Sequence, residues 1–498
     1  PESVQAALIR TDVLLAQNRL EEAKALLQGA RDENEESLEI RLALCLLSDG
    51  EGNWEESEKI LNEAERDLGD SAALRLARGR HLLRRRGDDT AELVGELAGG
   101  TEQLAEGEVT RLWQGLALLS FQAGDVEQAR ELAGRAAERD PNSLQARLLM
   151  MDVAVRTGDA SGLANVLEEI ERIEGKGAIW HYGRALYFRL LALEDLKQEG
   201  LLEQAKGHLA EARELRPQWS RIPALAAAIH DIEADQDRAI DEYLNAIALG
   251  ERNPESVRRL VFLLSARGRY SEADQVIRRV EEDRGPVSRA LLRMAGDVSL
   301  RLGHSDRALA IAERLAEGSG DFRDHVRLAQ VLGTLGLRAG SEQRDDESQA
   351  RLDQAEAALR RGVELARDEP ESWAALVRFL SETGETEKAA EVLAEIGEAV
   401  AEENVPLVLA RCYEAMEKPE EAAAQCEAAL EASDNPGVVA WAANFFTRTG
   451  KHAEAEKLLR RIIAGQVRGD EALVVWARRK LATTLAARGG YPRLTEAI

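Results

Sequence analysis

The chain has 498 residues and a formal net charge of −26, with 65 Lys and Arg against 91 Asp and Glu. Hydrophobic residues make up 44% of it but aromatic residues only 4%, so its core must be built from Leu, Ala, Val and Ile, which suits closely packed helices. No apolar run approaches the ~18 residues of a membrane-spanning helix. The negative charge repels phosphate backbones and lipid head groups, and so counts against nucleic acid or a membrane as the main partner.

A repeated segment sets the predicted elements along the whole chain. Its pattern is a turn at Gly124, a small residue at Ala129, apolar residues at Ala133 and Ala136, and a stop at Pro141. Aligned on Ala129, the pattern recurs at intervals of 33 to 37 residues, apart from two intervals of 42 and 47. The phased positions, ten of which are Ala, are Ala23, Ser57, Glu92, Ala129, Leu163, Ala205, Ala239, Ala273, Ala308, Ala355, Ala389, Ala422 and Ala455.

Each unit is predicted to be two helices separated by a tight turn. The first carries an apolar stripe, as in residues 113–119, and ends where Gly supplies a left-handed conformation. The second begins at once, and its phased Ala lets the two helices approach closely. Such a pair cannot bury its apolar face alone, so successive pairs must stack. Gly lies five residues before the phased position at Gly52, Gly87, Gly124, Gly158, Gly200, Gly268, Gly303, Gly384 and Gly450.

In chain order, the array begins in phase at Pro1-Glu2-Ser3 and is most divergent around Gly87 and Glu92. The interval of 42 predicts a helix lengthened by about eight residues, from Trp180 to Lys197. The interval of 47 predicts an exposed polar loop at 340–348. The domain prediction is therefore one continuous array over 1–498, with insertions near 180–200 and 338–350.

The last residues, 476–498, form the first part of a fourteenth unit and include Tyr491 and Leu494 at second-helix positions. They carry no polar capping helix of the kind that terminal repeats need for solubility. We therefore expect this sequence to be a segment of a longer chain, or its last apolar face to be covered by a partner.

The unit length, the Gly-x-φ-x-x-Ala core (φ, apolar) and endings such as 138–142 and 215–217 resemble tetratricopeptide repeats. The resemblance covers nearly the whole chain. It implies an all-α fold, a right-handed α-solenoid superhelix of about 13–14 helix-turn-helix repeats. The sequence departs from the family's first-helix signature of Trp, Leu, Gly and Tyr, since Trp113 and Leu116 are followed by Ala117 and Ser120.

Motifs of catalysis and cofactor binding are absent from the sequence. It has no Gly-rich loop ending in Gly-Lys-Ser/Thr, no Gly-x-Gly-x-x-Gly, no Cys-x-x-Cys, no His-Glu-x-x-His and no Gly-x-Ser-x-Gly. The seven histidines are dispersed, and the cysteines Cys45, Cys412 and Cys426 are too few for a disulfide framework or a thiolate zinc site. We expect reduced, buried thiols, no metal, no cofactor and no enzymatic activity.

The resemblance places the first helix of each unit on a concave surface that holds an extended peptide or a partner helix. The candidate groove residues in this sequence are Arg78, His81, Arg85, Arg111, Gln114, Gln145, Asp152, Arg156, Arg258, Phe262, Arg293, Asp297, Arg378, Arg411 and Asn444. Within and beside them, arginines cluster at positions 75, 78, 80, 84, 85 and 86. This cluster is predicted either to bind an acidic segment through bidentate hydrogen bonds or to pair with acids of the adjoining units.

Two specialised modes of the resembled family are not reproduced. The carboxylate clamp of chaperone-binding members uses Lys and Asn, where this sequence has Arg258 with Phe262, or Arg293 with Asp297. The asparagine ladder of glycosyltransferase-linked arrays is represented among the candidates by Asn444 alone.

The leading hypothesis is a non-enzymatic scaffold that binds a protein or peptide on its concave surface. One alternative is the docking or regulatory arm of a larger enzyme, and another is a periplasmic arm of a bacterial polysaccharide-export or secretion assembly. The full reading frame separates the three. The compartment is left open between cytoplasm and periplasm, and the frequent Ala and the preference for Arg over Lys are typical of a high-GC bacterial source.

Overall fold

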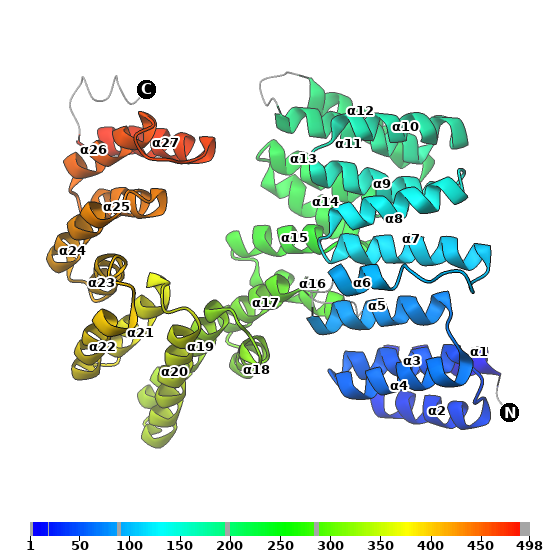
Figure 1. Cartoon of the computed structure of the whole chain (residues 1–498), viewed down its shortest axis with the longest axis horizontal. Coiled ribbons are helices and arrows are strands. Elements are labelled where there is room, and N and C mark those ends of the chain that lie inside the picture. The colour runs from blue at the N-terminus through cyan, green and yellow to red at the C-terminus, as the bar shows by residue number, and fades with distance from the viewer. Residues whose placement is uncertain (1–2, 18, 87–90, 195–199, 283–287, 489–498) are drawn as a thin grey trace. The chain divides into compact units, whose positions relative to one another are not determined.

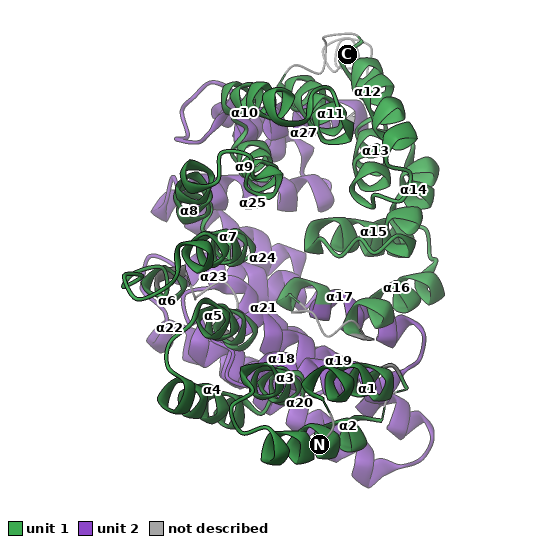
Figure 2. Cartoon of the chain, turned by 90° about the vertical axis from the view of Figure 1, so that its right-hand side faces the viewer, with its two compact units in different colours: residues 1–291 green, residues 292–498 purple. Residues whose placement is uncertain are grey.

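The computed structural model describes residues 3–17, 19–86, 91–194, 200–282 and 288–488 (Figure 1). Every regular element within these ranges is an α-helix, which confirms the all-α prediction. The chain divides into two compact units, Pro1–Leu291 and Leu292–Ile498, called unit 1 and unit 2 (Figure 2). Each unit is described by itself, so one continuous right-handed solenoid over 1–498 stays a prediction.

The helices follow one another in pairs, with odd-numbered first helices and even-numbered second helices. Those of unit 1 are α1 (Val4–Ala16), α2 (Leu20–Glu33), α3 (Leu38–Gly50), α4 (Trp54–Leu68), α5 (Ala72–Arg86), α6 (Ala91–Glu96), α7 (Glu106–Gln122), α8 (Val126–Arg139), α9 (Leu144–Thr157), α10 (Ala160–Glu174), α11 (Ala178–Glu194), α12 (Leu201–Leu215), α13 (Arg221–Ile232), α14 (Gln236–Ala248), α15 (Pro254–Ala266) and α16 (Tyr270–Glu282).

Helix α17 (Arg289–Arg301) spans the boundary between the units. The remaining helices, all in unit 2, are α18 (Ser305–Ala316), α19 (Phe322–Ser341), α20 (Asp345–Leu365), α21 (Pro370–Glu382), α22 (Thr386–Ala399), α23 (Val405–Ala415), α24 (Pro419–Ala432), α25 (Pro436–Arg448), α26 (His452–Ile463) and α27 (Glu471–Arg488). The predicted helix pairs are thus present, including the divergent one, whose second helix α6 has only six residues.

The turn between the two helices of a pair contains the expected left-handed residue. All the glycines predicted for this role have φ between 70° and 89°, except Gly87, which lies outside the described residues. Ala234 and Glu417 occupy the same position, five residues before Ala239 and Ala422, and adopt the same conformation with φ of 60° and 58°. The position therefore demands a left-handed backbone even where the residue has a Cβ.

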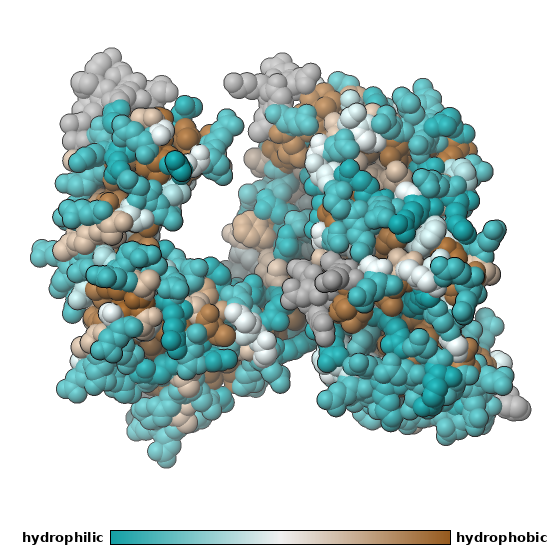
Figure 3. All heavy atoms as spheres, in the orientation of Figure 1, coloured by the Kyte–Doolittle hydropathy of each residue, from teal (hydrophilic) through white to brown (hydrophobic). Residues whose placement is uncertain are grey.

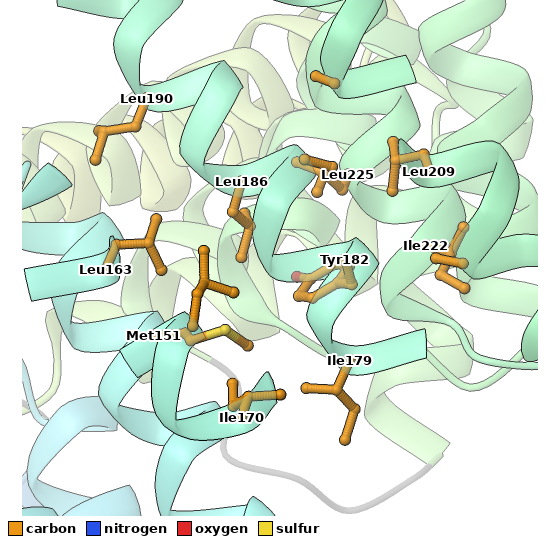
Figure 4. Packing of buried hydrophobic residues seen from close by; sticks show 14 of the residues in the cluster. Met151, Leu163, Ile170, Ile179, Tyr182, Leu186, Leu190, Leu209, Ile222 and Leu225 are labelled. Carbon is orange, nitrogen blue, oxygen red and sulfur yellow. The ribbon is translucent and has the colours of Figure 1, made fainter. Parts of the chain in front are cut away.

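The phased residues lie at the centre of each helix pair. All ten phased alanines have 0% exposure, as do Ser57 and Leu163, while the side chain of Glu92 lies outside the described part. Larger apolar residues close the layers between pairs: Met151 of α9, Leu163 of α10 and Leu186 of α11 meet in one such layer (Figure 4). Hydrophilic residues cover most of the face of each unit seen in Figure 3.

The two insertions lengthen helices. Helix α11 has 17 residues, against 14 in α9 and 12 in α13, and ends at Glu194; because Lys197 lies outside the described residues, a lengthening by eight residues stays a prediction. The exposed loop predicted at 340–348 is wrong, because α19 extends to Ser341 and α20 begins at Asp345 (Figure 1). Small residues allow this long hairpin: the Ser348 hydroxyl donates to the carbonyl of Gly336 over 2.8 Å, and a Cβ at Gly336 would lie 3.0 Å from Leu352.

The three cysteines are free and buried, as expected. Burial raises the pKa of each thiol, Cys45, Cys412 and Cys426, to about 12, so they are packing residues and not nucleophiles. Among the described helices, none has the combination of length and apolar character that crossing a bilayer requires.

Replacing Ala234 by Gly should raise the midpoint of thermal unfolding. A left-handed conformation costs a residue with a Cβ about 1–2 kcal/mol, and Gly removes this cost. The greater conformational freedom of Gly in the unfolded chain, however, lowers the stability by about 0.5–1 kcal/mol. We expect a net gain of about 0.5–1 kcal/mol. The matched control is Gly158→Ala, where a Cβ would meet nothing within 4 Å, so its expected loss reports the backbone alone. Equal midpoints for both variants and the parent would contradict this account.

Candidate functional site

The predicted groove residues lie on first helices, and many share one position in the repeat. Eleven residues before the phased position stand His81, Asp152, Phe262, Asp297, Arg378, Arg411 and Asn444. The same spacing places Leu46 on α3 and Leu118 on α7, which the sequence reasoning passed over in favour of charged residues. The exposed fractions of Leu46, Leu118 and Phe262 are 43%, 44% and 52%. In unit 1 this position holds these three large apolar residues and Ala228 beside the polar residues Asp12, His81, Asp152 and Glu194, whereas in unit 2 every residue at it is polar.

In unit 2, charged groove candidates pair with neighbouring first helices. Arg293 of α17 donates to Asp324 of α19 over 2.7 Å and to Asp321, at the start of α19, over 2.6 Å. Asp297 of α17 accepts from Arg327 of α19. These carboxylates hold the cations in place, and Asp324 is fully buried.

The same kind of pairing continues toward the end of unit 2. Arg411 of α23 donates to Glu371 of α21, and its guanidinium also lies 5.2 Å from the Trp441 ring of α25. Arg448 of α25 donates to Glu414 of α23. Arg411 thus connects α23 to α21 and α25, and Arg448, which is not a groove candidate, connects α25 to α23, whereas the candidate Arg378 of α21 has no such partner among the described residues.

In unit 1, a longer bridge links α13 to α9. Arg221 donates to both carboxylate oxygens of Asp152 over 2.9 and 2.8 Å, although 69 residues separate them. Tyr182 of α11 is 7% exposed and adjoins the bridge. Burial raises the pKa of Asp152, and the positive charge of Arg221 offsets this only in part. Asp152 is therefore a structural carboxylate that depends on its partner.

The arginine cluster on α5 pairs with acids of the preceding pair. Arg78 donates to Glu65 over 2.6 Å, and Arg85 to Glu58 over 2.9 Å. His81 is 4% exposed, and its Nδ1 lies 2.7 Å from Asp49 Oδ1, so placing it on the groove surface was wrong. Its burial follows from the closeness of α5 to α3. The sequence did not indicate this closeness, because the repeat is divergent around Glu92.

Other members of this cluster make similar contacts. Arg75 donates to Asp70 over 2.9 Å and to the carbonyl of Gly100 over 2.8 Å. The side chain of Arg86 lies outside the described part. Pairing with adjoining acids, one of the two predicted roles of the cluster, is therefore found for Arg75, Arg78 and Arg85.

The remaining candidates have local or solvent contacts. Gln114 donates to Ser143 over 3.0 Å, Arg111 to the carbonyl of Gly107 over 3.2 Å, and Arg258 to Glu255. Gln145 is exposed, and Arg156 is exposed with its guanidinium 5.1 Å from the ring of Phe121. Exposed Arg378 and half-buried Asn444 have no hydrogen bond to any residue of the described ranges.

Arg221→Met should destabilise unit 1 more than Asp152→Asn. The first change leaves a largely buried carboxylate without its counter-charge, at a cost of about 2 kcal/mol, whereas the second leaves a neutral amide and should cost less than about 1 kcal/mol. Urea unfolding measures both. The loss in Arg221→Met should shrink as the pH falls toward the ordinary aspartate value of about 3.9, because protonation of Asp152 removes the unpaired charge. Equal losses in the two variants at neutral pH would show that the bridge is not coupled in this way.

A family model for the tetratricopeptide repeat matches residues 14–80. No curated protein sequence matches the chain. Among solved structures, the chain is similar to the APC/C hetero-tetramer Cut9–Hcn1, with 14% identity, 82% of this chain and 90% of that chain covered, and a TM-score of 0.35. A human IFIT1 dimer with m7Gppp-AAAA is also similar, with 16% identity, 82% and 92% covered, and a TM-score of 0.35. Neither likeness is close enough to bear on function.

The matched residues span α2 to α4 together with parts of α1 and α5, and the same helix pairs continue through the other described ranges. These pairs have a left-handed turn, or a buried phased residue, or both, apart from α5–α6, whose Gly87 and Glu92 side chain lie outside the described part of the chain. The family match thus shows tetratricopeptide repeats over residues 14–80, and helix pairs of the same kind recur along the other described residues.

Proposed function

We propose that the chain is a non-enzymatic scaffold that binds a protein or peptide segment on its first helices. Repeats of this family generally serve as scaffolds for protein interactions, and stacked helix pairs offer a long surface with little catalytic chemistry. Three exposed apolar side chains at one repeat position of unit 1, Leu46, Leu118 and Phe262, carry the proposal, because a partner that covers them removes apolar surface from water.

Recognition on unit 1 would be mainly apolar. Covering Leu46, Leu118 and Phe262 would each contribute about 1.5–3 kcal/mol, before the costs of association are subtracted. The charged residues around them already have partners, as Arg221 has Asp152 and Arg259 has Asp231. A partner that relied on these cations would have to break existing ion pairs. This revises the expectation that arginines of the first helices bind an acidic segment directly.

The first helices of unit 2 would contribute differently. Arg378 is exposed and makes no polar contact with the described residues, and Asn444 is half-buried and likewise uncommitted. These two side chains can offer hydrogen bonds to the backbone of an extended partner. The expectation that nucleic acid is not the partner stays a prediction from the net charge of −26. The roles of an enzyme's docking arm or a periplasmic assembly arm would use the same surface.

The double variant Leu118→Glu with Phe262→Glu tests the proposal. Both side chains are exposed, so the fold should tolerate the change, while two lost apolar contacts of about 1.5 kcal/mol each should weaken partner binding by about a hundredfold. Affinity capture from a lysate of the source organism with quantitative mass spectrometry gives the retained proteins, and calorimetry with each purified candidate gives the affinity.

The matched control is Leu215→Glu with Leu337→Glu, which carries the same charge change. Leu215 ends the second helix α12 and Leu337 lies in the lengthened part of α19, and both are 55% exposed. A partner retained by the parent and by this control, but lost from the first variant, supports a scaffold. Identical retention by all three proteins overturns the apolar first-helix surface.

A further inference from the structure

Helices α11 and α12 bring together a cluster that the proposed surface does not use. The α11–α12 cluster consists of Trp180, His181, Arg184 and Phe188 from α11 and His208 from α12. Trp180, His181, Arg184 and Phe188 fall at helical spacing and so lie along one side of α11. The two histidines are 27 residues apart in sequence, and the long α11 brings them into contact.

The two imidazoles of the cluster share one hydrogen bond. The Nδ1 atoms of His181 and His208 lie 3.1 Å apart, which requires one of them to carry a proton and the other to be a bare acceptor. The Phe188 ring is stacked on His208 at 5.6 Å between centroids, and Trp180 meets both imidazoles edge-on. If both histidines were protonated, two donors would face each other and the hydrogen bond would be lost.

Arg184 has no carboxylate partner among the described residues, unlike arginines on the next two first helices. Its guanidinium carbon lies 4.7 Å from the Phe188 ring centroid and 5.8 Å from that of Trp180. Within the described ranges it has no hydrogen bond or ion pair, and its Nε is buried without a partner. By contrast, Arg221 and Arg259, on the next two first helices, each hold an aspartate with two hydrogen bonds. An unpaired guanidinium against aromatic rings is a ready donor to an anion.

Both cations and carboxylates lie around the cluster, but no carboxylate pairs with Arg184 among the described residues. Burial lowers the pKa of His208, and the positive charges of His181 and Arg184 lower it further, while Glu211 acts in the opposite direction. Lys176 lies 5.2 Å from the Trp180 ring, and its ammonium group is also 3.8 Å from a carboxylate oxygen of Glu171. Glu174 is engaged, because its carboxylate accepts the backbone N–H groups of Ile179 and Trp180 at the start of α11.

We propose that the α11–α12 cluster binds the carboxylate or phosphate group of a partner protein segment and takes up a proton as it does so. The inference rests on the proposed scaffold function and adds to it a second contact point and the chemistry of the group bound there. The guanidinium of Arg184 would hold the anion with two hydrogen bonds, and the aromatic rings would flank it. The anion would supply the counter-charge that a doubly protonated histidine pair needs.

Proton uptake predicts how the affinity of the cluster for an anion changes with pH. Without an anion, folding favours neutral His208, so this residue costs stability as the pH falls through its unfolded value of about 6.5. A bound anion favours the protonated form instead. By linkage, the anion must therefore bind more tightly as the pH falls from 7.5 to 5.5, and we expect a gain of about fivefold or more.

The probes are two short fluorescein-labelled peptides, one with four glutamates and one with a phosphoserine between glycines. Fluorescence anisotropy with the full chain at 0.15 M salt measures their affinity, since that salt screens the repulsion from the acidic surface beyond about 8 Å. The pH dependence is measured with the glutamate peptide, which stays ionised at pH 5.5, because the phosphate group itself titrates near pH 6. A tetraglutamine peptide is the neutral control, and the two anionic peptides distinguish carboxylate from phosphate.

Arg184→Gln should weaken binding of the preferred anionic peptide by about tenfold or more. The matched control is Arg213→Gln on α12, which removes one arginine from an exposed pair with Glu242 and should bind like the parent.

His208→Phe keeps an aromatic ring on Phe188 and should flatten the pH dependence. Arg184→Lys keeps the charge but not the two-pronged donor, and should give an intermediate affinity. Circular dichroism at each pH shows that the variants compared are folded.

Two results overturn the proposal: no binding of either anionic peptide at 1 mM, or equal binding by the parent and folded Arg184→Gln. Binding that does not change with pH in the parent would overturn proton uptake. None of these outcomes touches the scaffold proposal, which depends on Leu118 and Phe262 and is measured with a different ligand.

Discussion

A fully buried small residue, Ala in ten pairs and Ser57 in another, lets the two helices of a pair pack closely, and the rest of the fold depends on this approach. The phased alanines have no exposed surface, and a larger side chain there would push the helix axes apart. Close axes leave room for only a short connection, which forces the left-handed turn seen at Gly124 and even at Ala234. Because each pair exposes an apolar face, the pairs must stack, and stacking brings first helices side by side.

This side-by-side arrangement explains where the charges of the first helices go. An arginine on one first helix lies within reach of acids on the next, as Arg259 reaches Asp231 and Arg293 reaches Asp324. Such pairs neutralise the surface and fix the spacing of neighbouring helices. They leave the apolar side chains at the shared repeat position as the groups best able to gain from a partner. A solenoid that is acidic overall can therefore recognise its partner mainly through apolar contacts.

The repeat made the fold predictable, because period, turn glycines and phased alanines are local in sequence. The 340–348 loop was predicted wrongly because a polar segment without an apolar stripe also suits a hairpin whose outer faces meet water, with Gly336 at the contact. The site was harder to predict. The Asp152–Arg221 bridge and the contact of His181 with His208 depend on how far α11 extends and how pairs stack, which no local pattern encodes. The same spacing that located Phe262 would have located Leu46 and Leu118 had apolar residues been considered.

The central claim is that the first helices of unit 1 form a surface for a protein segment. Hydrogen–deuterium exchange of the chain, alone and saturated with a captured partner, tests it most directly because it reports every helix at once. The account predicts slower exchange in α3, α7 and α15 on binding, with the second helices α4, α8 and α16 little changed. Protection confined to the second helices, or none in unit 1, would contradict it.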